Sequence, residues 1–86
     1  MCNGLGVGKR LLCLIQDEAH VSIWTISRDG RHQDQVYEDS RTSNLEVRWA
    51  PRGSALYCIR RVGQRGELFK IYLRPDGGAA QRVRES

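Results

Sequence analysis

The sequence predicts an all-β protein, and three observations support this prediction. No window of the chain shows a sustained helical periodicity of apolar residues. Short runs rich in β-branched and aromatic residues alternate with turn signals made of Gly, Pro and Asp-Gly. Similar runs recur after roughly 45 to 48 residues, a period typical of repeat architectures built from small β-sheets.

The first half of the chain is expected to contain three strands, over residues 9–16, 21–27 and 34–37. The run KRLLCLIQ is short, apolar and bounded by turn residues, which is typical of a strand buried on both faces. The run SIWTIS is β-branched and aromatic, as strands prefer. Asp29 and Gly30 predict a tight turn, because Asp-Gly tolerates a positive φ. The polar residues 38–44 are expected to form a loop.

The second half is expected to contain four strands, over residues 45–50, 54–61, 67–73 and 80–84. Leu45, Val47 and Trp49 alternate with charged residues, which predicts a half-buried strand. The tripeptide Pro51-Arg52-Gly53 suits a type I turn, and residues 75–78 predict another turn. Strands joined by such short connections are expected to be antiparallel neighbours.

The predicted elements divide the chain into two similar units. We expect a degenerate N-terminal segment (1–7), a first unit (8–38) that lacks its innermost strand, a connecting loop (39–44) and a second unit (45–84). Gly8, Leu11 and Cys13 align with Gly53, Leu56 and Cys58 at a spacing of about 45 residues. Ile23, Trp24 and Asp29-Gly30 align with Ile71, Tyr72 and Asp76-Gly77 at about 47 to 48 residues. We assign the change in spacing to the hairpin between the two aligned blocks, because loops tolerate length changes.

The stretch GLGVGK (4–9) has the look of a phosphate-binding loop. A P-loop would need a glycine at position 3 and a hydroxyl side chain at position 10, where this chain has Asn3 and Arg10. The repeat offers a simpler interpretation, because Gly8 corresponds to Gly53 and would close the turn before an apolar strand. No phosphate site is therefore expected here.

Composition limits the classes of function. A chain of 86 residues allows one small domain, and 40% apolar with 28% charged residues is typical neither of a disordered chain nor of a membrane protein. No apolar run approaches the roughly 20 residues that cross a bilayer, and no signal-peptide pattern is seen. The net charge of +4 comes from arginines scattered along the chain, whereas a nucleic-acid surface would gather them on one face among aromatic residues.

No motif for catalysis or metal binding is present in the sequence. Cys2, Cys13 and Cys58 form no C-x-x-C pair, and His20 and His32 lie at no metal-ligand spacing from them. No nucleophile has an evident base. We therefore expect no catalytic residue, no cofactor and no metal.

Residues 47–78 (VRWAPRGSALYCIRRVGQRGELFKIYLRPDGG) resemble the TolB-type, WD-repeat-like β-propeller repeat. The matching residues are Trp49, Pro51 and Gly53 at its start and Ile71, Tyr72, Asp76, Gly77 and Gly78 at its end. Residues 23–31 match the end of a preceding repeat through Trp24, Asp29 and Gly30. Ala50 and Arg52 depart from the W-S-P-D-G element, so its aspartate is missing.

The resemblance implies about two antiparallel four-stranded blades of a six- or seven-bladed propeller. It implies a non-catalytic module for protein–protein interaction or ligand sensing in a bacterial protein, periplasmic or cytoplasmic. Its partners would be other blades, in a longer chain or by self-association, and an unidentified protein. Two alternatives stay open. One is the propeller portion of a larger enzyme, such as a prolyl-oligopeptidase-type serine peptidase, although no G-x-S-x-G element is present. The other is a small basic nucleic-acid-binding β domain, which we do not expect.

The blade interpretation also predicts the state of two cysteines. Cys13 and Cys58 occupy equivalent positions, so they should point the same way on stacked sheets about 10 Å apart. A disulfide needs its Cα atoms within about 7 Å. Both are therefore expected to be reduced core residues that do not bridge each other.

The same interpretation predicts which side chains the sheets bury and expose. Trp24, Tyr57, Phe69 and Tyr72 are expected to pack between sheets rather than to form a base-stacking platform. The outer faces are expected to expose Leu12, Leu14, Tyr57 and Ile59, and thus to need further sheets as cover.

Overall fold

The computed structural model describes residues 2–5, 10–51, 53–76 and 78–85 of the chain, with side chains for residues 10–51, 53–76 and 78–83. These residues form β-strands and no helix, so the all-β prediction is confirmed. The strands are β1 (Cys2–Leu5), β2 (Leu11–Gln16), β3 (His20–Ile26), β4 (Gln33–Ser40), β5 (Asn44–Trp49), β6 (Ala55–Val62), β7 (Arg65–Leu73) and β8 (Ala79–Glu85).

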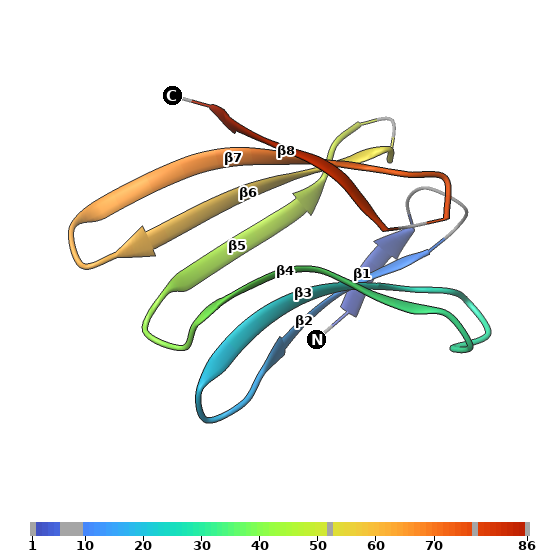
Figure 1. The fold of residues 1–86 in the computed structure, drawn as a ribbon, viewed down its shortest axis with the longest axis horizontal. Coiled ribbons are helices and arrows are strands. Elements are labelled where there is room, and N and C mark those ends of the chain that lie inside the picture. Colours follow the sequence, from blue (N-terminus) through green and yellow to red (C-terminus); the bar gives the residue numbers. More distant parts are fainter. Residues whose placement is uncertain (1, 6–9, 52, 77, 86) are drawn as a thin grey trace.

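The strands form two antiparallel sheets of four strands each (Figure 1). The first sheet has the order β1-β2-β3-β4 and the second has the order β5-β6-β7-β8. Within each sheet every strand pairs with its neighbours in the sequence, which confirms the prediction of antiparallel neighbours within each unit and reflects the short connections.

The prediction that the first unit lacks its innermost strand is wrong, because β1 pairs with β2 as a fourth strand. Cys2 lies opposite Cys13 and Asn3 lies opposite Leu12, with an irregularity between Asn3 and Leu5. Asn and Gly are poor strand formers, and a strand glycine often marks such a bulge. Tertiary pairing therefore overrides the weak local signal of residues that we expected to be degenerate.

The fourth strand, β4, is longer than predicted and includes residues that we expected in a loop. Glu38, Asp39 and Ser40 continue the ladder with β3, so only residues 41–43 connect the two sheets. The predicted loop boundary at residue 39 is thus wrong. The reason is tertiary, because the Asp39 carboxylate is held by an arginine of the second sheet.

The second and third strands of both sheets share one register, shifted by 45 residues. Leu11↔Ile26 in the first sheet becomes Leu56↔Ile71 in the second, and Gln16↔Val21 becomes Arg61↔Gly66. The hairpins between these strands therefore have equal length, and the predicted length change there is wrong. The difference in length between the two units lies in the connection between the third and the fourth strand. Ile26 pairs with Gln33, whereas the corresponding Ile71 pairs with Arg82, which lies farther along the chain.

This register also corrects the alignment of Ile23 with Ile71. Ile71 lies opposite Leu56, and the residue opposite the corresponding Leu11 is Ile26. Two-residue hairpin loops set the pairing of their flanking strands, so register follows the hairpins and not the chemical likeness of single residues.

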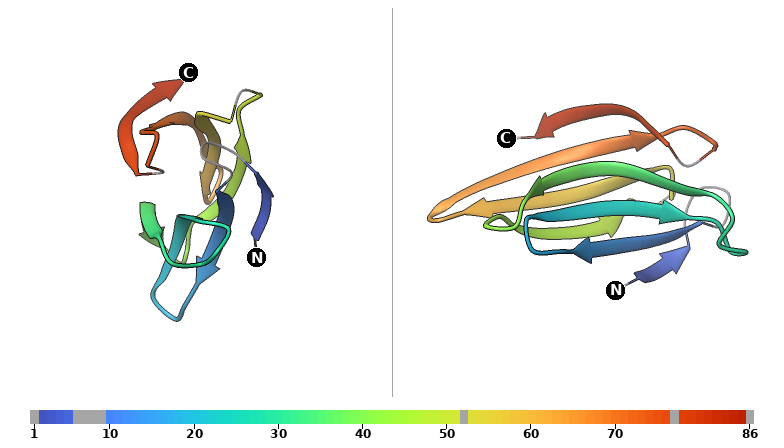
Figure 2. Two further views of the ribbon diagram at one scale, coloured as in Figure 1. Left: turned by 90° about the vertical axis from the view of Figure 1, so that its right-hand side faces the viewer. Right: turned by 60° about the horizontal axis from the view of Figure 1, so that its bottom comes forward.

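One apolar core lies between the two sheets, which stack face to face (Figure 2). Leu12, Val21 and Ile23 come from the first sheet. The second sheet contributes Leu45, Leu56, Cys58, Phe69, Ile71 and Leu73. Leu12 and Leu14 therefore face this core, and the prediction that they lie on an outer face is wrong.

The outward face of the first sheet alternates with the core residues. It carries Leu11, Cys13, Ile15, Ser22, Trp24 and Ile26, which pair with one another across β2 and β3. We call these residues the tryptophan face. The outward face of the second sheet carries Tyr57, Ile59, Leu68, Lys70 and Tyr72, which we call the tyrosine face.

Corresponding positions of the two sheets point in the same direction. Cys58 and Phe69 face the core, toward the first sheet, whereas their counterparts Cys13 and Trp24 lie on the tryptophan face, away from the second sheet. The sheets are therefore stacked head to tail. A two-fold arrangement would have turned both cysteines inward or both outward.

The two cysteines differ in state. Cys58 is free and buried, and it forms no bridge with Cys13. Cys13 is fully buried but disulfide-bonded, so the prediction that it is reduced is wrong. Pairing of β1 with β2 sets the backbone of Cys2 directly opposite Cys13.

Candidate functional site

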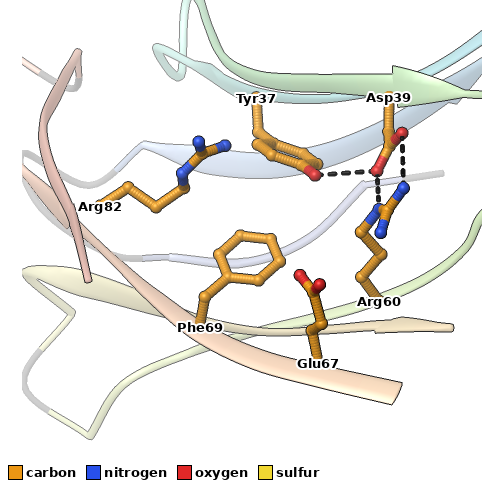
Figure 3. A pocket seen from close by; sticks show the side chains of 6 residues that line it. All are labelled: Tyr37, Asp39, Arg60, Glu67, Phe69 and Arg82. Atoms are coloured by element: carbon orange, nitrogen blue, oxygen red, sulfur yellow. Dashed lines mark hydrogen bonds and ion pairs between the residues drawn. The ribbon is translucent and has the colours of Figure 1, made fainter. Parts of the chain in front are cut away.

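The candidate site is a pocket of about 410 Å³ at the seam between the two sheets (Figure 3). We call it the seam pocket, and its lining residues are Tyr37 and Asp39 of β4, Arg60 of β6, Glu67 and Phe69 of β7, and Arg82 of β8. Strand alternation places these side chains, since Arg60 continues the inward series of Leu56 and Cys58. The two edge strands β4 and β8 come close to each other here.

An ion pair between Asp39 and Arg60 closes one end of the seam pocket and joins the sheets. The carboxylate accepts hydrogen bonds from Arg60 Nε and, at 3.5 Å, from Nη2. It also accepts one from the Tyr37 hydroxyl at 2.8 Å. Burial opposes ionisation, but the hydrogen bonds from Arg60 and Tyr37 prevail and lower the pKa of Asp39 to about 2.

The other end of the seam pocket is aromatic and cationic. The rings of Tyr37 and Phe69 lie 5.0 Å apart between centroids, at 44°. The Arg82 guanidinium lies 5.4 Å from the Tyr37 centroid and 6.0 Å from that of Phe69. Among the described residues Arg82 forms no ion pair within 4.0 Å. Its charge is thus available to an incoming anionic group.

Tyr37 and Asp39 of this pocket have strongly shifted pKa values. Burial and the hydrogen bond to Asp39 raise the pKa of Tyr37 to about 12. A general acid or base works best with a pKa near the operating pH. Because the pKa of Asp39 is about 2 and that of Tyr37 is about 12, Asp39 stays ionised and Tyr37 stays protonated at neutral pH. The two residues therefore supply a fixed charge and a fixed hydrogen bond.

A second pocket, of about 520 Å³, lies where the β3–β4 turn meets the β7–β8 turn, and it is lined by Arg10, Ser27, His32, Asp34, Pro75 and Asp76. Arg10 is buried here. It donates to Thr25 Oγ1 at 3.2 Å, to the carbonyls of Thr25 and His32 at 2.8 and 3.0 Å, and to Asp34 at 2.8 Å.

The predicted Asp-Gly turns have structural roles at this end of the sheets. Asp29 accepts the amide of Arg31 at 3.0 Å, and Gly30 has a φ of 76°. Asp76 accepts the amide of Gly78 at 2.8 Å. Side-chain hydrogen bonds from Ser27 and backbone ones from Arg31 lower the pKa of Asp29, and the Gly78 amide lowers that of Asp76. Gly77 lies outside the described residues.

The other motif residues occupy separate places. Trp49 is half-buried against the core, and its indole N–H is buried without an acceptor among the described residues. Pro51 lies in the predicted turn, which the amide of Gly53 closes on the Ala50 carbonyl at 2.8 Å. A pocket of about 240 Å³ brings Pro51 near Tyr72, whereas Ile71 is buried in the core.

The four aromatic residues considered for base stacking are not gathered in one place. Phe69 is buried in the core, as expected, and Trp24 lies on the tryptophan face with its indole N–H donating to Ser22 at 2.9 Å. Tyr57 and Tyr72 lie on the tyrosine face, each 40% exposed, so the expectation that they pack between sheets is wrong for the described chain.

Neither a metal cluster nor a membrane-spanning segment is seen in the part of the chain that the structure describes. No group of three or more His, Cys, Asp or Glu side chains there could hold a metal ion. None of the described residues forms a helix that could cross a bilayer.

Of the residues that line the seam pocket, Phe69 was singled out from the sequence, as a packing residue, and the charged residues were not. Arg60 and Arg61 are adjacent in the sequence, but Arg60 turns inward to Asp39 while Arg61 turns outward to Glu46 at 3.2 Å. The available signal was the alternation Leu56, Cys58, Arg60, which predicts an arginine on a core-facing side and hence a buried acidic partner.

The fold and the pocket together define an all-β protein of two stacked antiparallel sheets with a polar pocket at their seam. No known family model, no curated protein and no solved structure matches the chain.

Proposed function

We propose that the chain is a pair of TolB-like β-propeller blades that serves as a non-catalytic scaffold for protein interaction or ligand sensing. The observation that supports this is the shared register of the two four-stranded sheets, shifted by 45 residues, with corresponding faces pointing the same way. Rotation of one blade onto the next gives this relation, because each blade turns the same face toward its neighbour.

The binding part of the scaffold is the seam pocket. Its Arg82 guanidinium, which has no ion-pair partner among the described residues, and its two aromatic rings suit an acidic group carried next to an apolar one, as in an acidic and aromatic peptide segment. Asp39 and Arg60 neutralise each other and rigidify one end of the pocket. Arg82 supplies the cation at the aromatic end, and Glu67 balances its charge over the lining as a whole.

Titration of the ¹⁵N-labelled protein with a short peptide of glutamate and phenylalanine tests this function. The amide resonances around Tyr37, Phe69 and Arg82 should shift, and Arg82→Gln should weaken binding about tenfold, as loss of a charge-assisted hydrogen bond does. Arg31→Gln, at an exposed arginine in the β3–β4 turn, is the matched control and should leave binding unchanged. Equal binding by both variants would contradict the proposal.

A second candidate function is binding of single-stranded nucleic acid on the tyrosine face. The observation in its favour is that Lys70 lies between two exposed rings, 5.1 Å from the Tyr57 centroid and 4.8 Å from that of Tyr72. A thymidine oligonucleotide would then bind with an affinity that falls steeply with salt, and Tyr72→Ala would abolish it. No oligonucleotide binding at low salt would exclude this candidate.

A further inference from the structure

The tyrosine face is an uncovered apolar surface on the second sheet. Tyr57, Leu68 and Tyr72 are 40, 42 and 40% exposed. Ile59 between them is half-buried. Exposed apolar side chains gathered on one sheet face usually mark an interface.

The first sheet shows what covers the corresponding face. Tyr57 and Leu68 correspond in register to Leu12 and Ile23, which are 2 and 0% exposed. Their cover is the side of the second sheet that carries Cys58 and Phe69. The inner face of the first sheet therefore shows how the corresponding tyrosine face of the second sheet would become buried, namely by another sheet stacked on it.

A second surface of the chain corresponds in register to the side of the second sheet that covers the inner face of the first sheet. Cys58 and Phe69 correspond to Cys13 and Trp24 of the tryptophan face. This face lies on the opposite side of the stack and has its own exposed apolar residue, Ile15, at 44%. Of the other tryptophan-face residues, Leu11, Trp24 and Ile26 are half-buried and Cys13 and Ser22 are buried. The tyrosine face and the tryptophan face thus correspond in register to the two halves of the contact that joins the sheets.

We propose that the tyrosine face of one chain docks on the tryptophan face of a second copy, continuing the head-to-tail stack, an inference that rests on the proposed blade function. Charge supports this occupant. Residues of β5 to β7 on the tyrosine side include Arg48, Arg61 and Lys70 against one acidic residue, Glu46. The tryptophan side carries Glu38, opposite Ser22, with His20 Nε2 at 3.8 Å from its carboxylate. Such a heterologous contact repeats from copy to copy and closes into a ring when the rotation allows.

Sedimentation of the full chain over a concentration series, with two charge substitutions, tests the contact. Wild type should form species larger than a monomer. Leu68→Glu on the tyrosine face and Ile15→Glu on the tryptophan face should each weaken association at least about tenfold, because each buries an unpaired charge. Val62→Glu is the matched control, since Val62 is also an exposed apolar residue, at 37%, but belongs to neither face.

Mixing the two variants is the decisive measurement. Each variant retains the one intact face that the other lacks, so the mixture should form a heterodimer and nothing larger. A monomeric wild type, or loss of association by Leu68→Glu alone, would overturn the head-to-tail contact. Oligonucleotide binding that Leu68→Glu abolishes, with wild type monomeric, would assign the face to nucleic acid instead. Peptide binding at the seam pocket, measured on the same variants, keeps the proposed function testable if the assembly fails.

Discussion

At the scale of single residues, two arginines hold the described structure together from inside. Arg10 joins the carbonyls on either side of the β3–β4 turn to Asp34, and its side chain is only 7% exposed. Arg60 crosses from the second sheet to Asp39 of the first. Arg10 is buried and Arg60 is partly buried. Charges withdrawn from water in this way stabilise only because their hydrogen-bonding partners are complete, so removal of one partner costs more than the pair contributes.

Substitution of Arg10 is expected to destabilise the fold. Arg10→Met removes the donors that satisfy Thr25, the His32 carbonyl and Asp34 and should lower the free energy of unfolding by about 2 to 3 kcal/mol in urea titrations. Arg31→Met is the matched control, because its pair with Asp29 is exposed and spans 4.0 Å. It should change stability by less than about 0.5 kcal/mol, and equal losses would contradict the role given to Arg10.

The Asp39–Arg60 pair predicts a pH dependence of stability. The pKa of Asp39 is lowered to about 2 in the folded chain, against about 4 in the unfolded chain. Its contribution is therefore complete above pH 4 and is lost as the pH falls toward 2. Asp39→Asn should be less stable at pH 6 by about 2 kcal/mol, and the difference from wild type should shrink below pH 4.

Unfolding in urea at several pH values checks this expectation. Glu46→Gln, which removes the exposed pair with Arg61, is the control and should differ from wild type by less than about 0.5 kcal/mol throughout. A difference between wild type and Asp39→Asn that stays constant down to pH 2 would rule out the linkage.

At the scale of elements, two hairpins with the same register use different chemistry. In the β2–β3 hairpin, Asp17 accepts the amides of Ala19 and His20 at 2.8 and 2.7 Å. In the β6–β7 hairpin, Gly63 supplies a φ of 61° between Val62 and Arg65, which pair directly. An Asx turn and a left-handed glycine thus give equivalent loops, which is why the register is shared although the loop sequences differ.

The left-handed conformation at Gly63 predicts a cost for any other residue there. Gly63→Ala meets no atom within 4 Å, so its only penalty is the positive φ, about 1 kcal/mol of stability. Gly66→Ala in β7 also meets open space but has no such φ, and its effect should stay within about 0.5 kcal/mol. Thermal melts of the two variants compare them, and equal melting temperatures would contradict the turn assignment.

At the scale of the whole molecule, stability depends on keeping the two sheets together. The residues that are nearly inaccessible to solvent, Ile23, Leu56, Ile71 and Val21, come from both sheets and face one another. Cys58 lies in this core, and burial raises the pKa of its thiol to about 12. Its reactivity therefore reports separation of the sheets, because a thiol must be both exposed and ionised to react.

Alkylation of Cys58 is expected to follow unfolding. The Cys58 peptide, quantified by mass spectrometry at pH 8, should be modified at least about a hundredfold more slowly in buffer than in urea. Val62→Cys places a thiol at an exposed position of the same strand and should react quickly in both conditions. Rapid alkylation of Cys58 in buffer would show that the sheets open readily.

The sequence by itself determined the strand class, the turns and seven of the eight described strands, because alternation and turn chemistry are local. It also identified the 45-residue spacing in the strand pair that carries Cys13 and Cys58. Only the tertiary structure decided that β1 joins the first sheet, that β4 extends through Asp39 and that Arg60 turns inward to build the seam pocket. It likewise decided that Leu12 is covered while Tyr57 is not. Alternation shows which residues share a face of a strand, but where both faces are apolar it cannot show which one meets the other sheet.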